Sequence, residues 1–200
     1  FFIRSVRYYR DQISDAELQQ AVKGFIAQEA THRHQHSLLN QRLQEMGYPT
    51  EGIDWHIAKL LGRLEHRFSP EMRLAVTAAL EHYTATFAEI ILTSEEAQAL
   101  IGDTEVRPIL LWHALEESEH KAVAYDVFHA IGGSERTRVW GMRIATVLLF
   151  AELVIQTTRS LAGDRAAYNP VRLIRSLRAF RDNPLFSPAA IQRFRSYTRA

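Results

Sequence analysis

The chain has 200 residues, of which 46% are hydrophobic and 24% are charged, and its formal net charge is +1. These values are typical of a globular domain with a sizeable core, and the near-neutral charge argues against nucleic acid as a partner. The absence of cysteine excludes disulfides, thiolate nucleophiles and Cys-ligated metal centres, and it fits a cytoplasmic protein. Because the chain starts with Phe1-Phe2 and lacks an initial methionine, we expect its true N-terminus to lie upstream.

Apolar residues recur at helical spacing along the chain, and no stretch alternates as a strand does. The start signals are a capping box at residues 14–17, Asp54 as a cap, and Ser69 followed by Pro70. In chain order, the sequence predicts helices over residues 14–46, 54–67, 69–92, 94–101, 107–131 and 139–161.

The most apolar of these helices is the one over residues 139–161. Arg143, Glu152 and Arg159 interrupt it, so its uninterrupted apolar stretch is shorter than the ~20 residues that a membrane span needs. We therefore expect a buried helix of the bundle.

Beyond Asn169 the sequence becomes basic and amphipathic. Arginines at positions 172, 175, 178 and 181 alternate with apolar residues. This pattern fits either a solvated helix packed on the bundle or a peripheral contact with a membrane or an acidic partner. We predict two parts, a metal-binding bundle over residues 1–163 and a basic amphipathic extension over residues 164–200.

Two stretches share the spacing Glu-x-x-His, Glu29 to His32 and Glu117 to His120. Residues three apart lie on one helix face, so each pair aims a carboxylate and an imidazole in the same direction. In ferritin-like bundles, two such pairs and single glutamates from neighbouring helices form a dinuclear metal site. The prediction is an all-α, ferritin-like bundle of long helices with a C-terminal amphipathic helical extension.

Further candidate ligands share these faces. His36 lies on the stripe of Glu29 and His32, His113 and Glu116 lie on that of Glu117, and Glu81 is a single inward glutamate between small residues. Each group also has a purely structural alternative. For the histidines near His32 it is a hydrogen-bonded network in the core, for the face around Glu117 it is a set of salt bridges, and for the small residues around Glu81 it is close helix packing. Glutamate and imidazole without thiolate suit iron or manganese, with zinc as an alternative.

Three segments have a distinctive sequence: residues 25–32 (FIAQEATH) with His36, residues 81–85 (EHYTA), and residues 112–121 (WHALEESEHK) followed by 124–126 (AYD). They resemble the predicted metal-dependent hydrolases, a bacterial family of the ferritin-like helical grouping. The resemblance runs from Phe1 to about Ile131 and is loose beyond it. It implies two divalent metal ions, iron or else manganese or zinc, held by Glu29, His32, Glu81, Glu117 and His120.

The resemblance also implies supporting groups. His36, His113 and Glu116 are alternative ligands or groups that orient the ligands. The family pattern has one more glutamate just before the residues that match Phe1-Phe2, so that ligand is expected upstream of this chain, and Glu152 is a candidate substitute.

The implied activity is hydrolysis, in which metal-activated water attacks a carbonyl or phosphoryl group and His113 or a spare carboxylate such as Glu116 is the general base. An O2-activating di-iron oxidase or oxygenase acting on a small apolar substrate is the first alternative, and a metal-free structural or binding bundle is the second. The further expectations are a homodimer and a peripheral membrane contact through the C-terminal segment.

Overall fold

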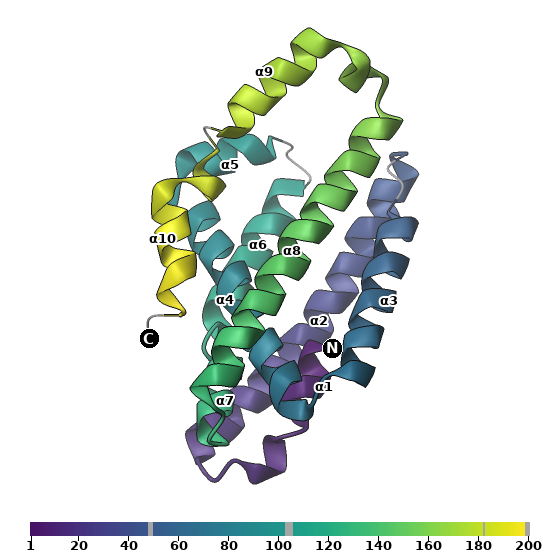
Figure 1. The fold of residues 1–200 in the computed structure, drawn as a ribbon. Coiled ribbons are helices and arrows are strands. Elements are labelled where there is room, and N and C mark those ends of the chain that lie inside the picture. Colours follow the sequence, from purple (N-terminus) through teal and green to yellow (C-terminus); the bar gives the residue numbers. More distant parts are fainter. Residues whose placement is uncertain (48–49, 103–105, 182, 199–200) are drawn as a thin grey trace. The chain divides into compact units, whose positions relative to one another are not determined.

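The protein is an all-α helical bundle, which confirms the predicted fold class (Figure 1). The structure, a computed structural model, describes residues 1–47, 50–102, 106–181 and 183–198, and over these ranges it contains helices and no strand. The helices are α1 (Phe2–Arg7), α2 (Ala16–Glu45), α3 (Glu51–Arg67), α4 (Pro70–Thr93), α5 (Glu95–Ile101), α6 (Val106–His120), α7 (Val123–Ala130), α8 (Glu135–Gly163), α9 (Pro170–Arg181) and α10 (Pro188–Ser196). Short 3-10 turns are η1 (Arg10–Gln12), η2 (Arg165–Tyr168) and η3 (Pro184–Phe186).

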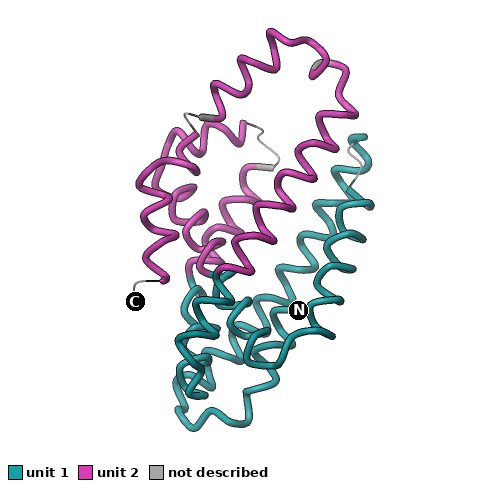
Figure 2. Tube along the Cα trace, in the orientation of Figure 1, with its two compact units in different colours: residues 1–81, 119–142 teal, residues 82–118, 143–200 magenta. Residues whose placement is uncertain are grey.

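The chain divides into two compact units, shown in different colours in Figure 2. Unit 1 comprises residues 1–81 and 119–142, and unit 2 comprises residues 82–118 and 143–200. The division falls within α4, α6 and α8. The boundary between residues 163 and 164 that the sequence predicts coincides with the end of α8, and it stays a prediction.

Short polar side chains begin several helices, as the sequence predicts. The Ser69 and Ser94 hydroxyls accept hydrogen bonds from the backbone N–H groups of Met72 and Ala97, each at 3.2 Å. At the start of α2 the cap is Asp15, one residue later than the predicted Ser14, and it accepts from the Glu17 N–H at 2.9 Å. These bonds satisfy N–H groups that have no partner within the helix.

The predicted start of α3 at Asp54 is wrong. The helix begins at Glu51, with Thr50 as the N-cap residue. The Asp54 carboxylate lies within the helix and accepts hydrogen bonds from the Asn40 side-chain amide, which is 2.9 Å from each of its oxygens.

The single helix predicted over residues 107–131 is two helices in the structure. α6 ends at His120, a turn follows at Lys121-Ala122, and α7 begins at Val123. Lysine and alanine are good helix formers, so the break has no local signal. It follows from tertiary packing, since α7 lies against α2 in unit 1 and buries Val127 and Phe128.

The core of unit 1 is aliphatic with a few aromatic rings. Its fully buried side chains come from α1, α2, α4 and α7 and include Val6, Val22, Phe25, Leu74, Val76 and Val127. One buried hydrogen bond, 2.7 Å between the hydroxyls of Ser5 and Thr77, joins α1 to α4. At the surface, Arg4 donates two 2.6 Å hydrogen bonds to the Glu65 carboxylate.

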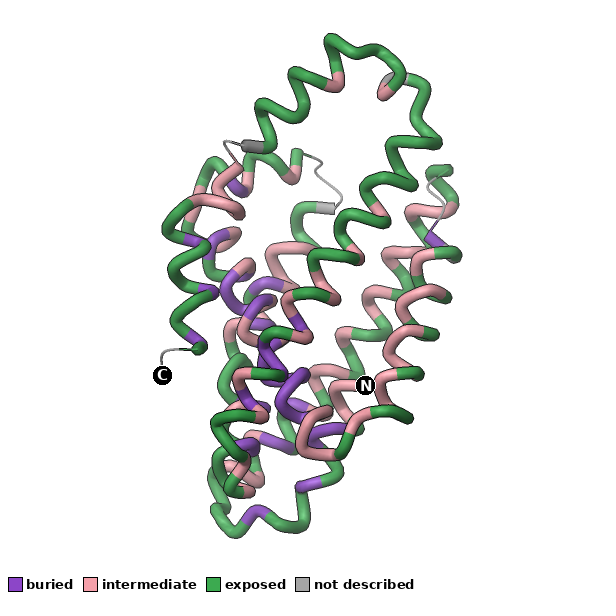
Figure 3. Tube along the Cα trace, in the orientation of Figure 1, coloured by how far each residue is buried: buried purple, intermediate pink, exposed green. Residues whose placement is uncertain are grey.

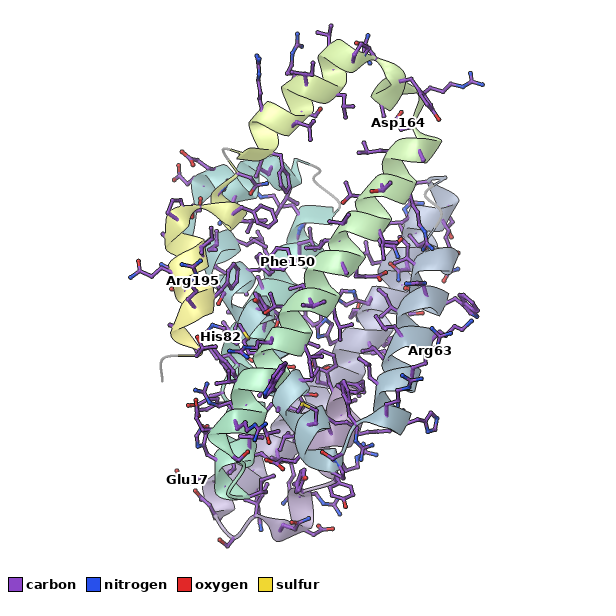
Figure 4. The ribbon with its side chains drawn as sticks, viewed as in Figure 1. Glu17, Arg63, His82, Phe150, Asp164 and Arg195 are labelled. Carbon is purple, nitrogen blue, oxygen red and sulfur yellow. The ribbon has the colours of Figure 1, made fainter. Side chains whose placement is uncertain are left out.

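In unit 2 the C-terminal helix α10 packs on α4. The ring of Phe194, which is 8% exposed, lies 4.9 Å from the ring of Tyr83 and 5.1 Å from that of Phe87, centroid to centroid. The imidazole of His82, labelled in Figure 4, makes a 3.0 Å hydrogen bond with the backbone oxygen of Arg193. The last described helix therefore belongs to the hydrophobic core of unit 2.

The apolar helix α8 is buried over only part of its length. Met142 and Ala145 are buried as predicted, but Val147, Leu153 and Val154 are exposed, and Figure 3 shows most of the C-terminal half of α8 in the exposed colour. Among the described residues, α8 is also the helix long and apolar enough to span a membrane by length and composition, and 17% of its most apolar window is buried. The prediction of a buried bundle helix is wrong from Val147 onward.

Candidate metal-binding side chains

Three candidate ligands lie together on one face of α2. The Nδ1 atom of His32 is 3.6 Å from Oε1 of Glu29, and both side chains are 14% exposed. The imidazole rings of His32 and His36 are 4.5 Å apart, centroid to centroid. Spacings of three and four residues place these groups on successive turns of the same face. The structure thus brings Glu29, His32 and His36 together, as the sequence predicts.

The electrostatic surroundings favour the neutral form of His36. Burial lowers the pKa of its imidazole below the ordinary value, and the neighbouring His32 adds to the decrease. The carboxylates of Glu29 and Asp54 act in the opposite direction. A neutral imidazole has a nitrogen lone pair that can bind a metal ion, so the microenvironment of His36 suits a ligand.

A second group lies on α6. Nε2 of His113 is 3.8 Å from Oε1 of Glu117, four residues apart on one face. Glu117 is 4% exposed, whereas Glu116 is half-buried and Glu119 is exposed. Glu119 accepts a 2.7 Å hydrogen bond from the side-chain amide of Gln28. Of these three glutamates, Glu117 is therefore the most buried. Its role as a ligand stays a prediction.

The predicted ligand His120 is the last residue of α6, but its side chain lies outside the described residues.

Glu81 on α4 is 1% exposed, in keeping with the inward orientation that the sequence predicts. Leu74, Thr77 and Ala78, which precede it on the same stripe, are also buried. At such a buried position an ionised carboxylate is on the order of several kcal/mol less stable than in water, unless cations or hydrogen-bond donors compensate its charge.

Glu152, the candidate substitute ligand on α8, is half-buried and accepts a hydrogen bond from the Gln156 side chain.

Sequence reasoning missed one pocket. It lies in unit 1, has a volume of about 640 Å³, and is lined by Asp15, Glu17, Leu18, Ala21, Tyr125, Asp126, His129 and Ala130. Burial raises the pKa of Asp126 above its ordinary value, and His129 opposes this increase. None of the predicted ligands lines this pocket, and the sequence signals near it are the capping box at residues 14–17 and the AYD segment at residues 124–126.

The fold and these side chains define a class of protein, an all-α helical bundle with groups of histidine and glutamate side chains that could bind a metal ion. The chain belongs to the family of predicted metal-dependent hydrolases, whose sequence model matches residues 1–200. This is the family that the motifs resemble, and the match includes the C-terminal third. Neither the curated proteins nor the solved structures include a significant match to the chain.

Proposed function

We propose that the protein is a metal-dependent hydrolase with a dinuclear carboxylate–histidine site. The proposed ligands are Glu29, His32, Glu81, Glu117 and His120, and the metal is iron, manganese or zinc. The observation that carries the proposal is the pairing of glutamate and imidazole at residues 29–36 in a member of a metal-dependent hydrolase family. The second Glu-x-x-His motif and the single buried glutamate follow the pattern of ferritin-like dinuclear proteins.

The donor groups fit such metals in type and in spacing. Zinc and similar ions bind imidazole nitrogen and carboxylate oxygen at ~2.0–2.2 Å, which puts two ligands of one ion roughly 3–3.5 Å apart. The Glu29–His32 separation of 3.6 Å is close to this span. Small side-chain adjustments therefore suffice for this pair to bind one ion.

A divalent metal held there would lower the pKa of water and polarise a substrate oxygen. The residues of the chain supply the rest. His113 and Glu116, both half-buried on α6, are the proposed general bases that accept the proton of the attacking water.

Oxygen activation is the second candidate function. Carboxylate-rich sites with one histidine per metal are also those of di-iron proteins, and the Glu29–His32 pair matches that composition as well as it matches hydrolysis. The two functions differ in metal: hydrolysis proceeds with zinc or manganese, whereas oxygen chemistry needs a redox-active ion.

The test is a comparison of activities after reloading with different metals. The chain is stripped with a chelator, reloaded with zinc, manganese or iron, and assayed with chromogenic carboxylic and phosphoric esters and with an oxygen electrode. The proposal predicts that zinc or manganese restores ester hydrolysis. It also predicts that Glu116→Gln or His113→Ala lowers the hydrolysis rate by about tenfold or more. Oxygen consumption with iron and no hydrolysis with any metal would establish the oxidase instead.

A further inference from the structure

The exposed side chains of α9 form a continuous apolar face. At about 100° per residue, Leu173, Ile174, Leu177 and Phe180 fall within an arc of roughly 120°. Ile174, Leu177 and Phe180 are each more than half exposed, and Leu173 is half-buried. Single exposed apolar residues need no explanation, but a contiguous face of large ones marks a binding surface. We name these four residues the α9 face.

The charged side chains of the C-terminal segment that contains α9 are almost all positive. Between Arg165 and Ala200 the sequence has eight arginines, one acidic residue (Asp182) and no lysine, although the whole chain is close to neutral. Arg172, Arg175 and Arg178 are exposed and lie on the arc of α9 opposite the apolar face. The partner of this surface must therefore combine an apolar interior with negative charge.

The helix before it, α8, also exposes large apolar side chains over its C-terminal half. Val147, Val154 and Leu161, spaced by seven residues, are exposed, whereas the polar Glu152 and Gln156 are half-buried and hydrogen-bonded to each other. Figure 3 shows most of this part of α8 and most of α9 in the exposed colour. Both helical segments belong to unit 2.

We propose that α9 docks on the surface of an anionic lipid bilayer. The α9 face enters the boundary between headgroups and acyl chains, and the arginines bind lipid phosphates through paired N–H groups. A second copy of this chain fits less well, because it brings the arginines of another α9 to the same surface and like charges repel. Insertion of α8 across the membrane fits less well too, because Arg143 and Glu152 interrupt its apolar stretch.

The test is co-sedimentation of the full chain with vesicles. One set contains phosphatidylcholine alone, and the other contains phosphatidylcholine and phosphatidylglycerol in equal parts. The charge variant replaces Arg172, Arg175 and Arg178 by glutamine, and the apolar variant is Ile174→Ser with Leu177→Ser. The matched control replaces three exposed arginines of unit 1, Arg42, Arg63 and Arg136, by glutamine. Circular dichroism checks that each variant keeps its helices.

The proposal predicts binding to the anionic vesicles that high salt and carbonate reverse, and weak binding to phosphatidylcholine alone. The charge variant lowers the partition coefficient about a hundredfold, the apolar variant at least about tenfold, and the control leaves it unchanged.

Three results would overturn the proposal. Equal losses in the control and the charge variant would show a non-specific charge effect. Binding that resists carbonate would show insertion of α8. An absence of vesicle binding would reject a membrane role, and if light scattering then showed a dimer that the apolar variant dissociates, the partner of the α9 face would be a second copy.

Discussion

Replacing Gly141 of α8 with alanine tests the close packing of α8 on α4 within unit 1. A Cβ atom at Gly141 would lie 2.7 Å from the Cβ and 2.8 Å from the carbonyl carbon of Ala75. Both distances are shorter than real Cβ contacts, and a backbone atom cannot move aside as a flexible side chain can. Overpacking of this kind destabilises by about 1–3 kcal/mol, whereas the higher helix propensity of alanine returns about 1 kcal/mol.

Because the clash involves backbone, we expect the upper part of that range and a net loss of about 2 kcal/mol for Gly141→Ala. Gly24 of α2 and Gly62 of α3 are the matched controls, since no heavy atom lies within 4 Å of the Cβ that would be added there. Alanine at either control position should stabilise by about 0.5–1 kcal/mol. The same substitution thus has opposite signs at the two kinds of site.

The assay is urea denaturation followed by circular dichroism, with thermal melting as a second readout. For a chain of this length, 1 kcal/mol shifts the melting temperature by about 2–4 °C, so Gly141→Ala should melt about 4–8 °C lower and Gly24→Ala about 1–4 °C higher. If Gly141→Ala were as stable as the wild type or more stable, the contact between α8 and Ala75 would be refuted.

Two further predictions concern the edges of the fold. Phe194→Ala removes a buried ring that packs on Tyr83 and Phe87, so it should destabilise by about 3 kcal/mol in the urea assay, and a loss below about 1 kcal/mol would show that α10 does not belong to the core. Glu65→Gln removes an ion pair with Arg4, whose hydrogen bond lowers the pKa of the Glu65 carboxyl. Because Arg4 is 62% exposed, we expect a loss of only about 0.5–1 kcal/mol at neutral pH. A lowered pKa in the folded state means that this contribution is complete above the ordinary glutamate pKa of about 4.3 and disappears as the pH falls through the lowered value. The wild type and Glu65→Gln should therefore converge in stability in acid, and a difference independent of pH would contradict the pairing.

Features with local causes are the ones that the sequence predicts well. Helix starts at Ser69 and Ser94 follow from side-chain hydrogen bonds to nearby backbone, and the cluster on α2 follows from helical periodicity alone. The inward position of Glu81 could also be predicted, because small and apolar residues define one side of α4.

Features with tertiary causes could not be predicted. The turn at Lys121-Ala122 lies among strong helix formers and follows from the packing of α7 on α2. The exposure of α8 beyond Val147 depends on which helices cover it, and hydrophobicity does not specify the covering element. Which glutamates share one metal ion depends in the same way on the packing of different helices, so the ligand set remains a prediction.

The most direct test of the proposed function is the metal content per chain, measured by plasma mass spectrometry on the wild type, His32→Ala and His34→Ala. The two variants remove the same side chain from one helix, but His34 is exposed and lies away from the Glu29–His32 pair. The proposal predicts about two divalent ions per wild-type chain and per His34→Ala chain, a clear loss in His32→Ala, and a melting temperature that rises with added metal only where metal binds. Wild-type protein without bound metal, or equal metal content in the two variants, would contradict the metal site and leave a helical bundle with a polar core.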